Sequence, residues 1–332
     1  MIDFQKLKEI VKNNHSFLIT THVNPDADAI GSEVAFSKIL DKLGKKYKII
    51  NHSPTPYNLL FLDTEKIIEK YDPTAHDNYF ESMDVLIALD FNRADRMVSM
   101  EKIFRSSSKL KVCIDHHQDP ESFADYYFVD TSYSATGHIL YDFINDTSII
   151  IMDRETAAPI YTAIMTDTGS FRFDRTTPEL HRVIADLLET GVSPSEIYNH
   201  VYDESKLSKI KLLGKSLSSL KLTTDNQIGY MVIHQSDFME LDALESDTDN
   251  FVNFILSIQG VVLGMLFIEL KNGFKVSFRS KGKIPVNKFA GLFGGGGHVN
   301  AAGARFRDKN MSVMIPQILS EAEKFLNNYI KG

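Results

Sequence analysis

Side chains that can bind metal ions recur at the ends of apolar segments in this 332-residue chain. Asp115, His116 and His117 directly follow one apolar run, and Asp90 ends another. The complete set consists of His22, Asp26, Asp28, Asp90, Asp115, His116, His117 and Asp167. Carboxylates and imidazoles from four separate segments are the usual materials of a site for hard or borderline divalent cations. The pattern therefore predicts a metal centre.

Electrostatics favours cations if these side chains converge. Carboxylates within a few ångström repel one another, and burying them in ionised form without a counter-charge is costly. Two divalent ions would roughly balance the charge, and a ligand set without thiolate favours Mn, Mg, Co or Zn. We expect two ions, with Mn²⁺ as the favoured metal. A single Asp at a helix start is usually a cap, and this stays the alternative for Asp26 and Asp28.

A glycine-rich segment near the C-terminus has the composition of an anion-binding loop. Gly294–Gly297 precede His298, and residues 301–303 are small as well. Glycines let backbone N–H groups approach one anion, and a helix beginning after them would add its positive end. We expect Arg279 and His298 to clamp a phosphate there. A flexible loop without a ligand is the alternative.

Alternating strand and helix patterns position the first set of residues. Residues 27–43 have an apolar stripe near the helical period, and Gly44 follows as the expected C-terminal cap. Strands are expected at residues 16–21, 48–51, 85–89 and 111–114. Apolar strands between helices are typical of a parallel sheet covered on both faces, where sites form beyond the carboxyl ends of the strands. Asp26, Asp90 and Asp115 have that position.

The second half predicts a helical connector and a smaller domain. Tyr133–Thr136 are expected to cap one helix, Thr177 and Pro178 to begin another, and residues 195–222 to be helical. Further elements are expected at residues 228–233, 261–270, 274–278 and 311–329. The predicted fold class is α/β, with a doubly wound, mainly parallel sheet in residues 1–190, a helical linker in residues 191–222 and a smaller α/β domain in residues 223–332.

Charge and composition limit the partners. The net charge of −8 argues against a long nucleic-acid duplex, which needs a broad basic face. Residues 271–309, however, contain nine basic residues and one acid, which suggests an anion-binding lobe. No apolar run approaches the ~18 residues of a membrane span, and a single cysteine, Cys113, fits a reducing compartment. We expect a cytoplasmic protein without a membrane partner; a homodimer is compatible with the sequence.

The ordered motifs resemble those of a known family. The set from His22 to Asp167 is similar to the four motifs of the DHH phosphoesterases, and the segment from Arg279 to Gly303 is similar to their accessory DHHA1 domain. Length and domain content most resemble the nanoRNase/pAp phosphatase subgroup. The resemblance implies hydrolysis of short single-stranded RNA oligonucleotides to mononucleotides, and removal of the 3′-phosphate of 3′-phosphoadenosine 5′-phosphate (pAp).

The resemblance also implies roles for single residues. One metal would be held by His22, Asp26 and Asp90, and the other by Asp28, Asp90, His116 and Asp167, with Asp90 bridging. Asp115 would orient the metal ligands, and His117 would contact the scissile phosphate and protonate the leaving oxygen. The substrate would be bound by Arg96, Arg279, Gly295, Gly296, Gly297 and His298. The segment after Asp90 reads Phe91-Asn92, where the family more often has small polar residues, and this leaves the details of that loop open.

Two-metal phosphoester hydrolysis is therefore the expected chemistry. A phosphodiesterase acting on cyclic dinucleotides, or on the linear dinucleotides derived from them, stays an alternative with the same chemistry. A long-strand exonuclease would need further nucleic-acid-binding domains, and a family II pyrophosphatase lacks the glycine-rich His298 segment. From a different class, a nucleotide sensor without catalysis stays open, although the complete set of metal residues argues against it.

Overall fold

The structure is a computed structural model that describes residues 2–118 and 120–330. Contacts within the chain divide it into two compact units, Met1–Glu204 and Ser205–Gly332, which are described separately. This division falls inside the segment expected as a linker, and the predicted boundaries at residues 190 and 222 stay predictions. None of the helices formed by the described residues combines the length and apolar character that a bilayer crossing requires.

Six parallel strands form the sheet of the first unit. Their order is β3-β2-β1-β4-β5-β6, and each neighbouring pair is parallel. The strands are β1 (Ser16–Thr20), β2 (Lys46–Asn51), β3 (Ile68–Lys70), β4 (Val85–Leu89), β5 (Leu110–Asp115) and β6 (Tyr126–Val129). The chain order reverses between β1 and β4, so the carboxyl ends of these two strands mark a topological switch point. The predicted parallel sheet is confirmed.

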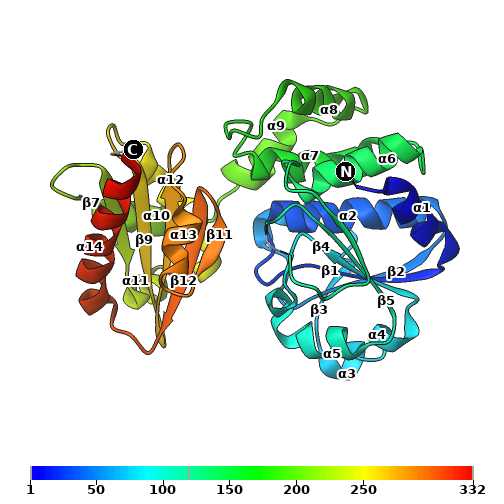
Figure 1. The fold of residues 1–332 in the computed structure, drawn as a ribbon, viewed down its shortest axis with the longest axis horizontal. Helices are drawn as coiled ribbons and strands as arrows, with labels where there is room; N and C mark the ends of the chain where they lie inside the picture. The colour runs from blue at the N-terminus through cyan, green and yellow to red at the C-terminus, as the bar shows by residue number, and fades with distance from the viewer. Residues whose placement is uncertain (1, 119, 331–332) are drawn as a thin grey trace. The chain divides into compact units, whose positions relative to one another are not determined.

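Helices cover both faces of this sheet, as Figure 1 shows. One face packs against α1, α2, α6 and α7, and the other packs against α4, α5 and the segment before α5. The helical segments are α1 (Phe4–Asn13), α2 (Ala27–Lys42), η1 (Tyr57–Leu59), α3 (Pro73–His76), α4 (Tyr79–Ser82), η2 (Ala94–Met100), α5 (Glu101–Ser106), α6 (Thr136–Thr147), α7 (Arg154–Asp167), α8 (Pro178–Glu189), α9 (Pro194–Tyr198) and η3 (Asn199–Asp203).

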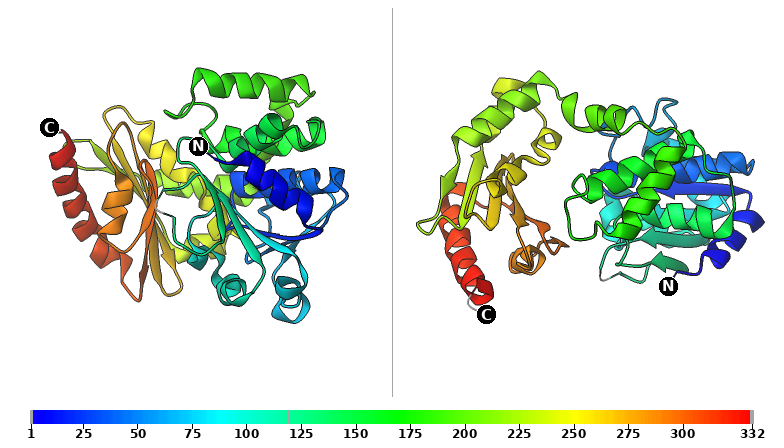
Figure 2. Two further views of the ribbon diagram at one scale, coloured as in Figure 1. Left: turned by 45° about the vertical axis from the view of Figure 1, so that its right-hand side comes forward. Right: turned by 90° about the horizontal axis from the view of Figure 1, so that it is seen from above.

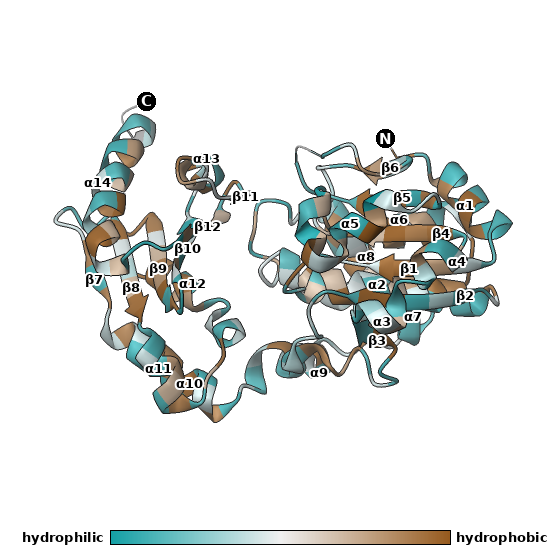
Figure 3. Cartoon of the chain, turned by 90° about the horizontal axis from the view of Figure 1, so that it is seen from below, coloured by the Kyte–Doolittle hydropathy of each residue, from teal (hydrophilic) through white to brown (hydrophobic). Residues whose placement is uncertain are grey.

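The hydrophobic pattern explains this layering. All five residues of β4 are buried, as expected for a strand covered on both faces. In β1, Phe17 and Ile19 belong to the core against α2, whereas Leu18 belongs to the core on the opposite face. The central strands accordingly carry the hydrophobic colours in Figure 3. Burial on both faces fixes the register of the strands, and therefore fixes which residues emerge at their carboxyl ends.

The second unit contains a mixed sheet with the order β11-β12-β10-β9-β8-β7. The strands are β7 (Lys221–Leu222), β8 (Ile228–Ile233), β9 (Leu263–Leu270), β10 (Gly273–Ser280), β11 (Gly296–His298) and β12 (Ala301–Arg307). Only β8 and β9 are parallel among the described pairs of this sheet. The predicted α/β character of this half is confirmed.

Helices also lie on both faces of the second sheet (Figure 2). Those of one face, α13 and α14, share a core with β9, β10 and β12, and those of the other, α10, α11 and α12, share a core with β8 and β9. The segments are α10 (Leu207–Ser218), α11 (Gln235–Leu241), η4 (Glu245–Thr248), α12 (Phe251–Leu256), α13 (Val286–Gly291) and α14 (Met311–Ile330).

The expectation of continuous helical structure from residue 195 to residue 222 was wrong. The helix α9 runs into the single turn η3, and a new helix, α10, begins at Leu207. The two parts serve different cores, because Ile197 and Val201 pack into the first unit whereas Leu212 packs into the second. An apolar stripe in the sequence does not show that its residues face two separate cores.

Candidate metal centre

The predicted residues of the first unit gather at the carboxyl ends of three strands. His22 lies two residues after β1, Asp90 directly follows β4, and Asp115 is the last residue of β5, with His116 next. Asp167 is the last residue of α7. Parallel neighbours end at the same edge of a sheet, so these side chains are brought together although they are far apart in sequence.

Asp90 lies at the centre of the group. Its Oδ2 lies 3.5 Å from His22 Nε2, and its Oδ1 lies 3.6 Å from His116 Nε2. Its backbone has a φ of 65°, which is uncommon for a residue other than glycine, and Thr136 Oγ1 donates a 2.9 Å hydrogen bond to its Oδ1. The two oxygens of one buried carboxylate therefore face two different imidazoles.

Two groups of potential ligands meet around this carboxylate. They are His22, Asp26 and Asp90 in one group and Asp28, His116 and Asp167 in the other, and within each group the ligand atoms lie within 4.8 Å of one another. The Nε2 of His116 lies 3.4 Å from Asp167 Oδ2 and 3.5 Å from Asp28 Oδ2. Ligand atoms about 2.1 Å from a common ion lie about 3.0–3.4 Å apart, so the spacing is close to that of a metal site.

The two aspartates that begin α2 have different local tasks. Asp26 is the N-cap of α2, and its other oxygen, Oδ2, lies 3.9 Å from His22 Nε2. Asp28 is buried and accepts hydrogen bonds from the backbone N–H groups of Thr136 (2.7 Å) and Gly137 (2.9 Å) at the start of α6. The expectation that Tyr133–Thr136 cap α6 was wrong, because Asp28 takes that place from another helix.

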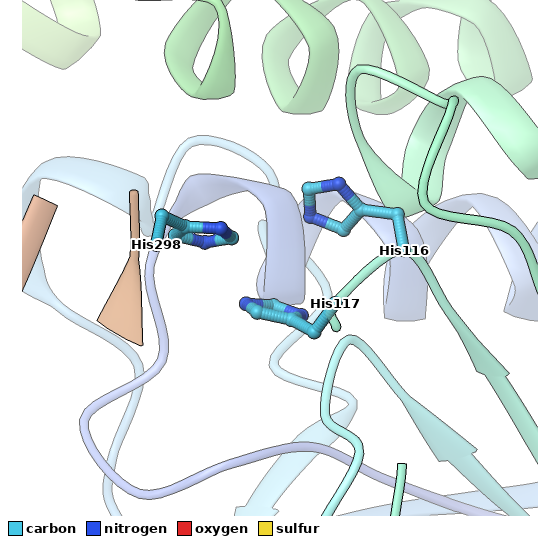
Figure 4. Close-up of side chains that lie close together, drawn as sticks. All are labelled: His116, His117 and His298. Atoms are coloured by element: carbon cyan, nitrogen blue, oxygen red, sulfur yellow. The ribbon is translucent and has the colours of Figure 1, made fainter. Parts of the chain in front are cut away.

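Asp115 and His117 form a hydrogen-bonded pair. The Nδ1 of His117 lies 2.6 Å from Asp115 Oδ1, and Asp115 is fully buried. Figure 4 shows that His117 projects from the segment that follows β5, next to His116. A carboxylate on Nδ1 fixes the tautomer and the orientation of the imidazole ring. The second oxygen of Asp115 has no hydrogen-bond partner among the described residues, and a buried carboxylate oxygen of this kind fits a place beside bound cations.

Crowding of acids perturbs their ionisation. Burial, then the charge of Asp26, raises the pKa of Asp28 to about 6. Burial, then the charges of Asp28, Asp26, Asp115 and Asp167, raises the pKa of Asp90 well above its usual value. The pKa of Asp167 is raised for the same reasons. Ionising all of these groups together requires positive charge, so the cluster fits divalent cations with oxygen and nitrogen ligands.

Two further residues contribute to the centre, Thr136 and Arg175; Thr136 was expected from the sequence only as part of a helix cap, and Arg175 was not singled out. Thr136 contacts Asp90 through its hydroxyl group and Asp28 through its backbone. Arg175 donates a 2.7 Å hydrogen bond to the carbonyl oxygen of Tyr133, and its guanidinium lies 3.3 Å from His116 Nδ1. Both act on candidate ligands from distant segments. Neither residue forms a motif with them at a fixed short spacing that could have revealed it.

Arg96 is tied to the loop that carries His22. Its carbonyl oxygen accepts a 2.8 Å hydrogen bond from the backbone N–H of Val23, and its side chain is exposed. Its positive charge acts on both His22 and Asp26. In the same segment, Val98 has a φ of 49°, a strained conformation for a β-branched residue. The structure therefore places the predicted arginine in the electrostatic field of the candidate centre.

In the second unit the predicted anion-binding residues lie on the β11–β12 hairpin, in the segment just before it and on the neighbouring strand β10. Arg279 on β10 pairs with Ala301 on β12, and His298 on β11 pairs with the same Ala301. Gly297 has a φ of 139°, and the Cβ of any residue at Gly295 would meet the carbonyl oxygen of Gly303. The glycine run leads into β11 and β12 and not into a helix, so the helix dipole that a following helix start would have added is not provided there.

Comparison with known proteins decides the family. The DHH family, N-terminal domain, matches residues 16–164, and the DHHA1 domain matches residues 227–331. A bifunctional oligoribonuclease and PAP phosphatase, NrnA, of Thermus thermophilus is 33% identical over 93% of this chain and 89% of its own length. The chain belongs to the DHH family.

Two further relatives agree with this DHH assignment. The bifunctional oligoribonuclease and PAP phosphatase NrnA of Bacillus subtilis is 28% identical over 87% of this chain and 88% of its own length. Among solved structures, an exopolyphosphatase-related protein from Bacteroides fragilis has a TM-score of 0.89 at 31% identity and covers 98% of this chain and 96% of that one. The similarity thus extends over both units of this DHH protein.

Proposed function

We propose that this DHH protein is a metal-dependent phosphoesterase that hydrolyses short RNA oligonucleotides to mononucleotides and removes the 3′-phosphate of pAp. The observation that carries the proposal is Asp90, a buried carboxylate whose two oxygens face His22 and His116. The names of the relatives in Thermus thermophilus and Bacillus subtilis support both substrates. The domain boundaries, the cytoplasmic location and a homodimer stay predictions.

The donor set suggests how two ions would be held. His22, Asp26 and Asp90 would bind one ion, and Asp28, Asp90, His116 and Asp167 would bind the other, which matches the two groups around Asp90. Bound divalent cations would lower the pKa of a water molecule and stabilise negative charge on the phosphoryl oxygens. Because all these ligands are oxygen or imidazole nitrogen, we favour Mn²⁺ among the divalent ions.

The pair of Asp115 and His117 would handle the proton. Asp115 accepts the hydrogen bond of His117 Nδ1–H and holds the ring in one orientation. The Nε2 of His117 would then protonate the leaving oxygen, because the Nδ1–H is engaged by the carboxylate. His117 is partly exposed, unlike the buried Asp115 and His116, which suits a side chain that contacts substrate.

Residues of the basic segment would bind the rest of the substrate. We propose that Arg279 and His298 bind a substrate phosphate, that the backbone of Gly295, Gly296 and Gly297 approaches it closely, and that Arg96 contacts the substrate near the metal centre. Few basic residues take part, so we expect short single strands or a mononucleotide bisphosphate to suit this protein better than long duplex nucleic acid.

One comparison of rates tests the proposal. Purified protein is incubated with Mn²⁺ and, separately, with a two-residue RNA, pAp and a linear dinucleotide derived from a cyclic one. We expect release of mononucleotide from RNA and of phosphate from pAp, both abolished by a chelator and restored by Mn²⁺. A preference for the linear cyclic-dinucleotide product would favour the alternative phosphodiesterase. Protein that binds Mn²⁺ but leaves all three substrates intact would exclude the enzyme and favour the nucleotide sensor.

A further inference from the structure

A buried polar pair, Glu33 and Asn51, lies outside the candidate ligand set. Glu33 is on α2 and Asn51 is the last residue of β2, and both side chains are fully buried. The Nδ2 of Asn51 donates a 2.8 Å hydrogen bond to Glu33 Oε2. The other carboxyl oxygen, Oε1, has no hydrogen-bond partner among the described residues. A buried polar group is costly when its hydrogen bonds are not satisfied, and the unpaired Oε1 of Glu33 therefore calls for an explanation.

The pair is connected to two loops that carry candidate ligands. The Oδ1 of Asn51 accepts a 3.1 Å hydrogen bond from the backbone N–H of Thr21, the residue before His22. The hydroxyl group of Thr21 donates a 2.8 Å hydrogen bond to the carbonyl oxygen of Leu89, the residue before Asp90. A continuous series of hydrogen bonds therefore runs from Glu33 to the backbone on which both ligands are mounted.

We propose that Glu33 and Asn51 are positioning residues that set His22 against Asp90 and so determine the affinity of the centre for divalent metal. The inference rests on the proposed metal-dependent function for its catalytic meaning. The geometry supports it, because each link of the series is buried and each joins a different element: α2, β2, and the ends of β1 and β4. Groups that orient metal ligands in this way commonly change metal affinity about 10–100-fold when they are removed.

Glu33 performs this role as a neutral acid. Burial raises its pKa to about 8, the hydrogen bond from Asn51 opposes that shift, and the charge of Asp63 adds to it. Asp63 is itself held by the backbone N–H groups of Ile67 and Ile68, which fixes that negative charge near Glu33. The pair therefore contributes hydrogen bonds at neutral pH without adding a further negative charge to the protein interior.

Calorimetric titration of the metal-free protein with Mn²⁺ tests the positioning role. Asn51→Leu removes the acceptor of the Thr21 N–H, and we expect Mn²⁺ affinity to fall at least about tenfold. Ile39→Val, a fully buried position on the same helix outside the hydrogen-bond series, controls for general loosening of the fold. Its affinity should equal that of the wild type. Equal affinities in wild type and Asn51→Leu would overturn the proposal.

Three further variants keep the test decisive if Asn51→Leu fails to fold. Thr21→Val removes the hydroxyl link to Leu89 at nearly constant shape, and it should weaken Mn²⁺ binding and lower kcat with KM little changed. Glu33→Gln keeps an acceptor for Asn51 and should bind Mn²⁺ like the wild type, whereas Glu33→Leu should not. Loss of affinity in Glu33→Gln equal to that in Glu33→Leu would contradict the role of the hydrogen bond.

The protonation of Glu33 has its own readout, which needs neither metal nor substrate. An acid whose pKa is raised by folding weakens the folded state above its unfolded pKa of about 4.5, and the loss grows until the folded pKa of about 8. The unfolding midpoint of the wild type should thus fall relative to Glu33→Gln from about pH 4.5 to pH 8 and then run parallel to it. Parallel curves throughout would show that Glu33 is ionised. Wild type that binds Mn²⁺ but hydrolyses no substrate would exclude the proposed function alone.

Discussion

The two units handle charge in opposite ways. In the first, four polar groups of the candidate centre are buried at the edge of a parallel sheet: Asp28, Asp90, Asp115 and His116 are each at most 2% exposed. In the second, most basic residues of the segment 271–309 are exposed, and Arg305, 52% exposed, pairs with Glu245, whereas Arg279 is only partly exposed. Buried charge needs a partner, whereas exposed charge costs little.

The difference between the two units shows that buried, clustered charge indicates a ligand more directly than exposed charge does. Several aspartates brought together in a sheet interior destabilise the metal-free protein, so their presence indicates a ligand that restores the balance. Basic residues at a surface need no such explanation, and their role in binding phosphate depends on chemistry with a substrate. The stability of the first unit should therefore depend on metal and pH. In the second unit, the stability should depend on the space around the glycine backbone, and its basic residues should affect KM.

Removal of the shared carboxylate should give the largest effect. In Asp90→Ala both proposed ion sites lose a carboxylate ligand, and we expect kcat to fall about a thousandfold or more, beyond the loss from one missing charge-stabilising donor. Mn²⁺ binding, measured by calorimetry, should weaken together with activity. The matched control is Asp95→Asn, an exposed acid of the following segment that pairs with Arg93. Asp90→Ala protein with normal Mn²⁺ affinity would contradict the central position of Asp90.

Several residues of this centre that could be predicted from the sequence lie at the ends of apolar strands. His22, Asp90 and Asp115 were found because burial on both faces fixes where each strand ends, and parallel strands end together. The bonds from Thr136 and Gly137 to Asp28 join residues more than 100 positions apart. They depend on how α2 packs against α6, and local patterns do not encode this packing.

The glycine-rich segment shows the same limit in the second unit. Glycines suit both a helix start and a tight hairpin, so composition alone left both open, and the structure has β11 and β12. The pairing of Gly297 with Ala302 decides between them, and it depends on the neighbouring strand β10. Arg175 was missed for a related reason, since its contacts with Tyr133 and His116 form only when the segment after α7 folds back.

In metal-free protein, the stability of the first unit should depend on pH between about 3.8 and 6, whereas that of the second unit should not. Because folding raises the pKa of Asp28 from 3.8 to about 6, its contribution destabilises the fold increasingly between those values and stays constant above pH 6. Each unit of displacement corresponds to about 1.4 kcal/mol, so the loss is about 3 kcal/mol. As the pH rises over this range, hydrogen exchange should show that the backbone amides of β4 lose protection and that those of β9 do not. Saturating Mn²⁺ should restore the protection of β4. Equal losses in both strands would contradict the assignment.

A pair of glycine substitutions tests the backbone of the second unit. A Cβ at Gly295 would collide with the carbonyl oxygen of Gly303, whereas a Cβ at Gly296 meets no atom within 4 Å. Gly295→Ala should lower the stability of this unit by about 1–3 kcal/mol through overpacking, and Gly296→Ala should leave it unchanged. Hydrogen exchange in β12 measures both, and Mn²⁺ affinity should stay that of the wild type. Equal protection in the two variants would show that the hairpin tolerates a side chain at Gly295.

The smallest expected effect concerns substrate binding. Arg279→Ala removes a charge-assisted bond worth about 1.5–3 kcal/mol, so KM should rise about tenfold or more while kcat stays close to the wild-type value. Arg305→Ala is the matched control, because Arg305 lies on the neighbouring strand β12 and already pairs with Glu245. The KM of Arg279→Lys should lie between those of the wild type and Arg279→Ala, since a lysine keeps the positive charge but not the planar, two-pronged guanidinium. An equal rise of KM in Arg279→Ala and Arg305→Ala would mean that the basic surface acts only through its total charge. The first unit would then hold a specific metal centre, whereas the second would hold no specific phosphate site.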